Sequence, residues 1–337
     1  MHMADALLSP AVGGAMWAAT GVAIAVASNK MKRSLDHRQV PLMGILGALV
    51  FAVQMLNFAI PGTGSSGHFA GGLLLAILLG PHAGFLTIAS VVTVQALFFA
   101  DGGLLALGAN IFNMGFLACY VVYPFIYKPL AKGRMSRAVT WMAAILALQL
   151  GAFGVVVQTA VSGIAELPLA AFMLAMQPIH LAIGIGEGLI TLAVIELITR
   201  AEPGILPRSQ STPTGLLAGK RALAALAVLA MVSGGLFSWF ASSNPDGLEW
   251  SIAKLTGEEA TLTGASSSLH QAAASLQEKL SFLPDYNFPA PEEAKSDDGA
   301  FVHPDAGTTL SGLVGGLIVL AFAILAGLLL KRRPEAA

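Results

Sequence analysis

The chain has 337 residues, of which 55% are hydrophobic and only 11% are charged. Soluble domains carry about 25% charged residues, so this composition excludes an ordinary soluble enzyme or binding domain. The net charge of −1 gives no sign of a nucleic-acid partner, and the single cysteine, Cys119, excludes an intramolecular disulfide and a cysteine metal cluster.

The hydrophobic pattern predicts an all-α polytopic membrane protein. Apolar stretches recur along the chain, and about 20 apolar residues are enough for a helix to cross a bilayer. The third stretch is short and is cut by Gly80 and Pro81, which allows a hairpin with the fourth. We expect nine spans, at about residues 10–29, 41–60, 69–80, 83–100, 104–127, 138–161, 168–199, 222–240 and 309–330.

The distribution of Lys and Arg predicts the orientation. Fifteen of the 18 basic residues lie on one side of the nine-span arrangement, in segments 30–38, 128–137, 200–221 and 331–333. Cytoplasmic loops are enriched in Lys and Arg, so the N-terminus is predicted outside and the C-terminus in the cytoplasm. A cleaved signal peptide ending near Ala27 is the alternative, but Asp5 stands where such a peptide carries positive charge.

The chain begins Met1-His2, a pair that can chelate a metal through three nitrogens. They are the α-amine of Met1, the backbone amide nitrogen of His2 and Nδ1 of the His2 imidazole. One corner of a square plane stays open for another imidazole, and an all-nitrogen square plane favours Ni(II) or Cu(II). The amine has a reference pKa of about 7.7–8.0, so binding should weaken in acid. The alternative is that His2 has no role.

The loop 61–68 supplies a second histidine, His68, on the side of the membrane predicted for Met1. The loop contains no Lys or Arg, and its glycines allow close approach of the backbone. We therefore predict that His68 provides the fourth nitrogen. The alternative is an interfacial histidine beside a flexible turn.

Polar residues within or beside the spans are further candidates, because buried ionisable groups in a bilayer are usually functional. His180 lies toward the outer half of the seventh span, where it could support a metal ligand. The alternative for each is a structural hydrogen bond between helices. The predicted supporting residues around the metal are Asp5, Ser66, Asn110, His180 and Glu187.

The composition changes at 201–220, which is rich in Pro, Gly, Ser and Thr and typical of a linker. It separates a domain at 1–200 from a module at 221–337. That module has an outer loop, 241–308, with eleven acidic residues and three lysines, a field that would concentrate cations. Within the loop, 250–280 has the composition of a helix and 284–308 is expected to be irregular.

Small residues recur every four positions in the first two spans. In membranes such faces let helices pack closely. One stripe is expected to hold the protein's own bundle together and the other to dock a partner helix. The stripes are Ala11, Ala15, Ala19, Ala23 and Ala27 in the first span, and Gly44, Ala48 and Ala52 in the second.

Several segments together resemble the NikM/CbiM family, the substrate-specific membrane components of energy-coupling-factor (ECF) transporters for nickel or cobalt. They are the start of the chain at 1–10 and the stretches 67–72, 79–81, 101–110 and 180–191. The segment Pro245–Ser251 is similar to the signature of the small NikN/CbiN component, here fused behind the first domain.

The resemblance implies a seven-helix metal-capture bundle, with one helix before a six-helix core, followed by two more transmembrane helices. It implies that Met1, His2 and His68 bind the metal and that Gly44, Ala48 and Ala52 contact a coupling protein. The outer loop would assist metal loading. Residues 3–7 depart from the common start of the family, which leaves the preference for nickel or cobalt open.

The resemblance also implies partners and location. The partners would be a transmembrane coupling protein and two cytoplasmic ATPases, because this chain has no phosphate-binding loop of its own. The protein is thus expected to be a transporter subunit of a bacterial or archaeal cell membrane, surrounded by lipid. It would carry nickel(II) or cobalt(II) without a permanent cofactor and would not be an enzyme.

Two alternatives belong to other functional classes. Gly64-Ser65-Ser66-Gly67 fits the motif of a rhomboid-like intramembrane serine protease, with Ser66 as nucleophile and His180 as base. That alternative explains neither Met1-His2 nor the fused module. The other alternative is a metal sensor that does not transport.

Overall fold

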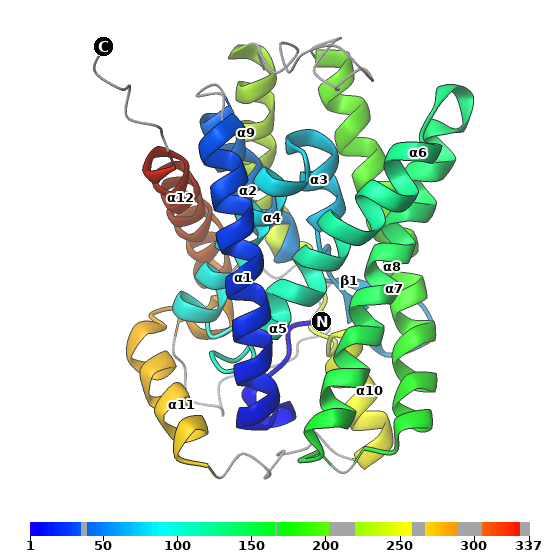
Figure 1. Ribbon diagram of the computed structural model, residues 1–337, viewed down its shortest axis with the longest axis vertical. Helices are drawn as coiled ribbons and strands as arrows, with labels where there is room; N and C mark the ends of the chain where they lie inside the picture. Colours follow the sequence, from blue (N-terminus) through cyan, green and yellow to red (C-terminus); the bar gives the residue numbers. More distant parts are fainter. Residues whose placement is uncertain (35–38, 166, 202–219, 258–266, 289–304, 331–337) are drawn as a thin grey trace.

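A computed structural model describes residues 1–34, 39–165, 167–201, 220–257, 267–288 and 305–330. The predicted linker, apart from its first and last residues, lies outside these ranges. Most of the described chain is helical (Figure 1). The main helices are α1 (Pro10–Ser34), α2 (Gln39–Gln54), α3 (Gly72–Leu79), α4 (Pro81–Phe98), α7 (Ser136–Ser162), α8 (Leu169–Ala201), α9 (Lys220–Gly235), α10 (Gly247–Thr256), α11 (Ser268–Leu280) and α12 (Ala306–Leu329).

One further long helix is composite. It joins α5 (Leu107–Ile111), a π-helical stretch (Phe112–Tyr127) and α6 (Lys128–Leu130). The described residues also include four 3₁₀ turns, at Asp5–Leu7, Gly133–Met135, Phe237–Phe240 and Pro284–Tyr286.

Six described helices are long and apolar enough to cross a membrane. They are Pro10–Arg33, Pro81–Phe98, Leu107–Leu130, Ser136–Ser162, Leu169–Arg200 and Ala306–Leu329. Two shorter apolar helices, Gln39–Gln54 and Ala222–Gly235, lie in the second and eighth predicted spans, and the eight-residue α3 lies in the third. Each predicted stretch therefore contains a helix, but the nine-span count exceeds the six helices of spanning length.

The prediction of an all-α fold is wrong in one place. Strand β1 (Phe58–Ile60) pairs antiparallel with β2 (Ser65–Gly67), with Ala59 opposite Ser66. The second predicted span ran to residue 60, whereas helix α2 ends at Gln54. The residues between are apolar enough to extend a hydropathy pattern, and only the pairing with β2 turns them into a hairpin.

The helices of the first domain approach one another at glycines. A Cβ on Gly84 of α4 would lie 2.8 Å from the backbone nitrogen of Ala76 in α3. A Cβ on Gly108 of α5 would lie 2.6 Å from the backbone nitrogen of Trp17 in α1, where Thr20 also donates a hydrogen bond to the Gly108 carbonyl at 2.7 Å. Small residues thus set the helix spacing, as is usual in membrane bundles.

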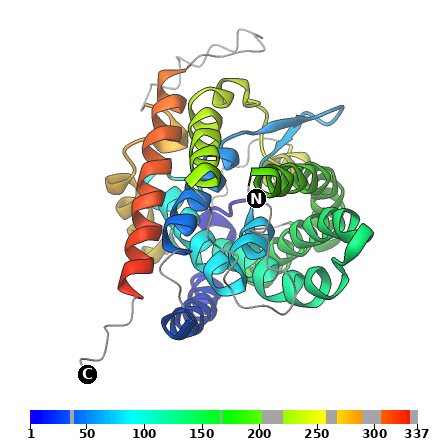
Figure 2. The same ribbon diagram turned by 90° about the horizontal axis from the view of Figure 1, so that it is seen from above.

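Helices α9 and α12 pack beside α2, and α12 lies on the side of the molecule away from α7 and α8 (Figure 2). A Cβ on Gly44 would lie 2.7 Å from the Leu320 side chain of α12, and Ala48 faces Gly316 of the same helix. The stripe predicted to contact a coupling protein is therefore covered, in this structure, by the chain's own C-terminal module. In the other predicted stripe, Ala11, Ala15 and Ala19 are exposed, whereas Ala23 and Ala27 are buried.

Helices α10 and α11 lie at the end of the bundle where α1 begins, and the described C-terminal helix α12 ends toward the opposite end (Figure 1). The predicted helical region 250–280 covers α11 and all of α10 except its first three residues, and 258–266 lie outside the described residues. In the region predicted to be irregular, Pro284–Tyr286 forms a 3₁₀ turn, α12 begins at Ala306, and 289–304 lie outside the described residues. The module thus covers the end of the bundle into which the N-terminal segment folds.

Candidate metal site

The first residues of the chain are buried inside the bundle. Met1 is 5% exposed and Met3 is fully buried. Asn110 holds the Met3 backbone with two hydrogen bonds, since its Oδ1 accepts from the Met3 nitrogen at 2.8 Å and its Nδ2 donates to the Met3 carbonyl at 3.1 Å. Asp5 accepts a hydrogen bond from the Ala106 backbone at 2.9 Å. Asn110 in α5 and Ala106 just before α5 therefore fix the position of the N-terminal segment that carries Met1 and His2.

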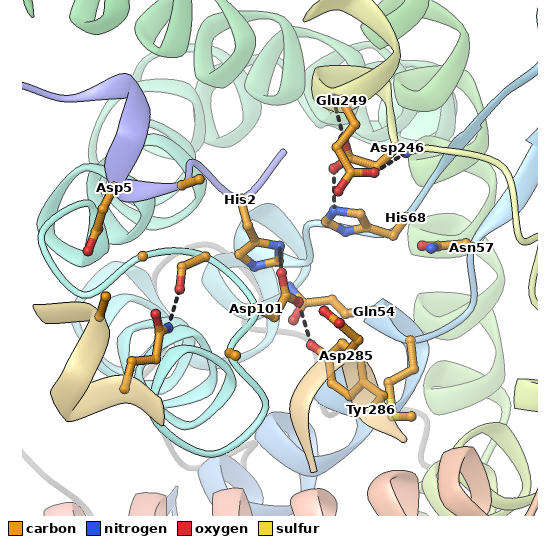
Figure 3. A pocket seen from close by; sticks show the side chains of 17 residues that line it. His2, Asp5, Gln54, Asn57, His68, Asp101, Asp246, Glu249, Asp285 and Tyr286 are labelled. Carbon is orange, nitrogen blue, oxygen red and sulfur yellow. Dashed lines mark hydrogen bonds and ion pairs between the residues drawn. The ribbon is translucent and has the colours of Figure 1, made fainter. Parts of the chain in front are cut away.

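The structure brings Met1, His2 and His68 together. The α-amine of Met1 lies 2.9 Å from Nε2 of His68. The His2 and His68 rings stack with their centroids 5.1 Å apart and their planes inclined by 12°, and Figure 3 shows both rings at the same cavity. Nε2 of His2 is buried and has no hydrogen-bond partner among the described residues. Several nitrogen donors thus meet in one small volume.

The Nδ1 atom of His2, which the sequence assigned to a chelate, has a different neighbour in the structure. It lies 3.0 Å from Oδ1 of Asp101 (Figure 3). Within the described residues, no group of three or more His, Cys, Asp and Glu side chains is placed to hold a metal ion. A metal bound here would therefore need nitrogens of the N-terminal backbone as well as side chains.

The surroundings of His68 disfavour protonation of its imidazole. Burial lowers its pKa, and the positive N-terminal amine lowers it further. Its Nδ1 lies 3.3 Å from the Phe69 carbonyl, which can only accept a hydrogen bond. In the neutral ring this contact favours the proton on Nδ1, which leaves the Nε2 lone pair toward Met1. This is the tautomer of a metal-ligating histidine.

Two carboxylates contact these nitrogens, and they come from different parts of the chain. Asp246, at the start of α10, forms an ion pair with the Met1 amine and lies 3.7 Å from Nε2 of His68. Asp101 contacts His2 and accepts a hydrogen bond from the hydroxyl of Tyr286. Burial opposes ionisation of both carboxyls. The positive Met1 amine nevertheless holds the pKa of Asp246 well below the usual range, and His2 does the same for the pKa of Asp101.

A cavity of about 440 Å³ opens beside the two histidines (Figure 3). Five acidic residues line it and no Lys or Arg does among the described residues. A pocket of one charge sign raises the local concentration of the opposite ion, here a cation. The acidic lining consists of Asp5, Asp101, Asp246, Glu249 and Asp285, and the polar lining includes Gln54, Asn57, Gln277 and Tyr286.

Two of the predicted supporting residues, Glu187 and His180, lie beside the His68 loop and Met1. Glu187 accepts hydrogen bonds from the backbone nitrogens of Ala70 at 3.0 Å and Gly71 at 3.1 Å, just after His68. His180 and Met1 line one small pocket, and the Nδ1 of His180 pairs with the Met176 carbonyl at 2.8 Å.

The protease alternative fails at its nucleophile. Ser66 donates its hydroxyl to the Asn244 carbonyl at 2.8 Å. The Nε2 of His180 has no hydrogen-bond partner in the described part of the chain. Ser66 and His180 therefore do not form the dyad that a serine protease needs.

Sequence reasoning missed the side chains with which the fused module holds the site. His270 of α11 contacts the carbonyls of Asp5 at 3.1 Å and Leu8 at 2.9 Å. Gln277 donates to the Gly102 carbonyl at 2.7 Å, next to Asp101. Asp246 was visible only as part of a signature segment. No local pattern in the sequence links these residues to the N-terminus.

These features define a polytopic helical membrane protein with a buried nitrogen-rich cluster at an acid-lined cavity. The chain belongs to the family described as the cobalt uptake substrate-specific transmembrane region, whose model matches residues 2–205. The PDGLE domain matches residues 220–332. The resemblance noted from the sequence is thereby confirmed, in both its parts.

Two relatives share the fused arrangement by name. The putative fused nickel transport protein NikMN of Archaeoglobus fulgidus is 34% identical over 323 residues, which cover 95% of this chain and 96% of the relative. The fused nickel transport protein NikMN of Rhodobacter capsulatus is 31% identical and covers 70% of this chain and 74% of the relative. A crystal structure of a transition metal transporter aligns with a TM-score of 0.54 at 31% identity, over 60% of this chain and 94% of that one.

Proposed function

We propose that this protein is the substrate-binding membrane component of an ATP-driven ECF-type transporter that takes up nickel(II) or cobalt(II). The metal is captured from the outer side in a plane of four nitrogens. These are the Met1 amine, the His2 amide nitrogen, Nδ1 of His2 and Nε2 of His68. The observation that carries the proposal is the 2.9 Å approach of the Met1 amine to His68, with the His2 ring stacked alongside.

Formation of this plane requires a local rearrangement. Nδ1 of His2 has to leave Asp101 and turn toward the metal, while the amine and the amide each release a proton. Square-planar nickel(II) suits such a ligand set, so nickel is the first choice and cobalt the second. In the proposed supporting layer Asp5 and Asn110 place the N-terminal segment, Glu187 places the His68 loop, and Ser66 and His180 pack around it.

The proposed organisation follows the two family matches. Residues 1–200 form the metal-binding domain, 201–220 the linker and 221–337 the fused module. The N-terminus faces outward and the C-terminus the cytoplasm. A transmembrane coupling protein and two cytoplasmic ATPases supply the energy. If the coupling protein binds at Gly44, Ala48 and Ala52, it has to compete with α12, which packs against Gly44 and Ala48 in the structure.

The proposal is tested by metal titration of the purified full chain, after mass spectrometry has verified a free N-terminal amine. Nickel, cobalt, copper and zinc are added separately, and binding is followed by visible absorption and metal content. One equivalent of nickel with the absorption band of a planar site is expected. Replacing His2→Gln or His68→Ala should abolish that band, because each removes one imidazole ligand of the plane.

His82→Ala is the matched control, because His82 is hydrogen-bonded to Tyr120 and is not among the residues lining the cavity. It should bind nickel like the unaltered chain. If the His2→Gln variant binds nickel with the same band and affinity as the unaltered chain, the N-terminal chelate is wrong.

A further inference from the structure

Asp246 is held rigidly at the start of α10. Its Oδ1 accepts hydrogen bonds from the backbone nitrogens of Leu248 at 2.7 Å and Glu249 at 2.9 Å, and the Glu249 side chain returns a bond to the Asp246 backbone. This reciprocal capping box fixes the side chain of the residue that caps the N-terminus of the helix. Because Oδ1 is used for the cap, Oδ2 is the oxygen directed at Met1 and His68.

The segment before α10 is attached to the hairpin that carries His68. The Ser66 backbone nitrogen donates to the Pro245 carbonyl at 2.8 Å, and Ser66 forms a parallel bridge with Asp246. Trp250 donates from its indole nitrogen to the Thr63 carbonyl at 2.9 Å. Asp246 and His68 are therefore held by the same small piece of structure, although they belong to different family domains.

The Met1 amine is a buried positive charge, and Asp246 is itself only 16% exposed. A buried charge is tolerated only when it is paired. Asp101, the other carboxylate in contact with the cluster, pairs with His2 and Tyr286 and forms no ion pair with the amine among the described residues. Within the described residues, Asp246 is therefore the acid that balances the amine.

The same balance holds after chelation. An ammonium carries one positive charge, and so does a divalent metal bound to a neutral amine, neutral imidazoles and one deprotonated amide. The two protons released on binding offset the two charges of the metal. A carboxylate that neutralises the amine can therefore neutralise the metal complex without moving into the ligand plane.

We propose that Asp246 is the fixed counter-charge of the metal site, contributed by the fused module. This inference rests on the proposed function, because it concerns the metal bound there. It assigns the module a direct part in binding: the domain at 1–200 supplies the nitrogens and the module supplies the carboxylate that makes their complex neutral.

The test is nickel titration of the full chain with two neutral replacements, Asp246→Asn and Asp246→Ser. Asn and Ser are both good helix caps, so α10 should persist in each. Both should bind nickel at least about tenfold more weakly, because the metal complex keeps a positive charge that neither variant neutralises, whereas the empty site can lose its charge with the amine proton. The absorption band should keep its position, since Asp246 is not a ligand in the plane.

Glu278→Gln is the matched control, since Glu278 is an exposed acid of the same module, on α11. It removes the same unit of charge and should leave affinity unchanged. Nickel binding at full affinity in either Asp246 variant overturns the inference, and so does an equal loss in Glu278→Gln. A shift of the band in both Asp246 variants overturns it as well, in favour of a bonded ligand. If the unaltered chain binds no nickel, the proposed function itself fails.

Discussion

The imidazole rings of His2 and His68 lie nearly parallel, with centroids 5.1 Å apart. One ring belongs to the N-terminal segment and the other follows strand β2, so neither element alone determines the pair. Each ring is positioned by backbone hydrogen bonds to a buried polar side chain nearby. Asn110 binds Met3, next to His2, and Glu187 binds Ala70 and Gly71, just beyond His68.

Replacing Glu187→Gln should loosen the His68 loop. The carboxylate accepts one backbone hydrogen bond on each oxygen, and an amide can accept only one of them. A buried donor left unsatisfied costs about 1–3 kcal/mol, so we expect a lower unfolding temperature and several-fold weaker nickel binding. Thermal unfolding in detergent and nickel titration measure the two effects.

Glu196→Gln is the control for this prediction. Glu196 lies on the same helix but is exposed, where it pairs with Arg137 and Arg200. The same substitution there should change neither quantity appreciably. Equal effects at the two positions would show that the Glu187 hydrogen bonds contribute nothing specific to the loop.

Asn110→Ala should release the N-terminal segment. It removes both hydrogen bonds to the Met3 backbone and leaves that buried peptide group without its side-chain partner. We expect a loss of stability of about 2 kcal/mol. Hydrogen exchange of residues 1–8 should become faster than in Asn29→Ala, a replacement at an exposed position of α1. Identical exchange in the two variants would contradict this role.

Gly103→Ala should displace Asp5. A Cβ at Gly103 would overlap the Asp5 side chain and backbone, both of which are fixed by neighbouring contacts. We expect a destabilisation of about 1–3 kcal/mol together with weaker nickel binding. Gly14→Ala is the comparison, because nothing lies within 4 Å of a Cβ there and alanine favours the helix. Thermal unfolding should separate the two variants, and a neutral Gly103→Ala would mean that this contact relaxes freely.

Gly312→Ala should separate the two long helices of the fused module. A Cβ at Gly312 would overlap the backbone of Gly234 in α9, which cannot move aside as a side chain can. We expect a loss of about 1–3 kcal/mol in unfolding free energy. Gly316→Ala, one turn further along α12, meets only an ordinary contact with Ala48 at 3.9 Å and should be neutral or slightly stabilising. The reverse order of stability would refute close packing of α9 on α12.

The apolar helices, and the proximity of Met1, His2 and His68, could be predicted from the sequence because each depends on simple information. Hydropathy indicates a buried or membrane helix over a single stretch, and Met1-His2 is a chelating unit by its covalent structure alone. The prediction that His68 lies on the same side of the membrane as Met1 required only the number of membrane crossings between them. The structure brings all three together.

The β-hairpin and the contacts of the module could not be predicted in this way. Residues 58–60 become a strand only because they pair with Ser65–Gly67. Asp246 contacts Met1 only because α10 docks beside that hairpin, and Tyr286 reaches Asp101 only once α11 and the following turn cover the cavity. Hydrophobic periodicity is a local property of the sequence, so it does not indicate which distant segments pair.

A parallel bridge between Ser66 and Asp246 sets the register in which the segment before α10 lies along strand β2. This register determines which side chain faces the N-terminal amine. Successive residues of an extended segment point to opposite sides, so a slip of one position would present a neighbour in place of Asp246. Those neighbours are Pro245 and Gly247, and neither has an ionisable side chain. The alignment of strand β2 with the segment around Asp246 thus decides whether a carboxylate faces the N-terminal amine. Inserting or deleting one residue in either segment would have the same effect as a mutation that removes this charge.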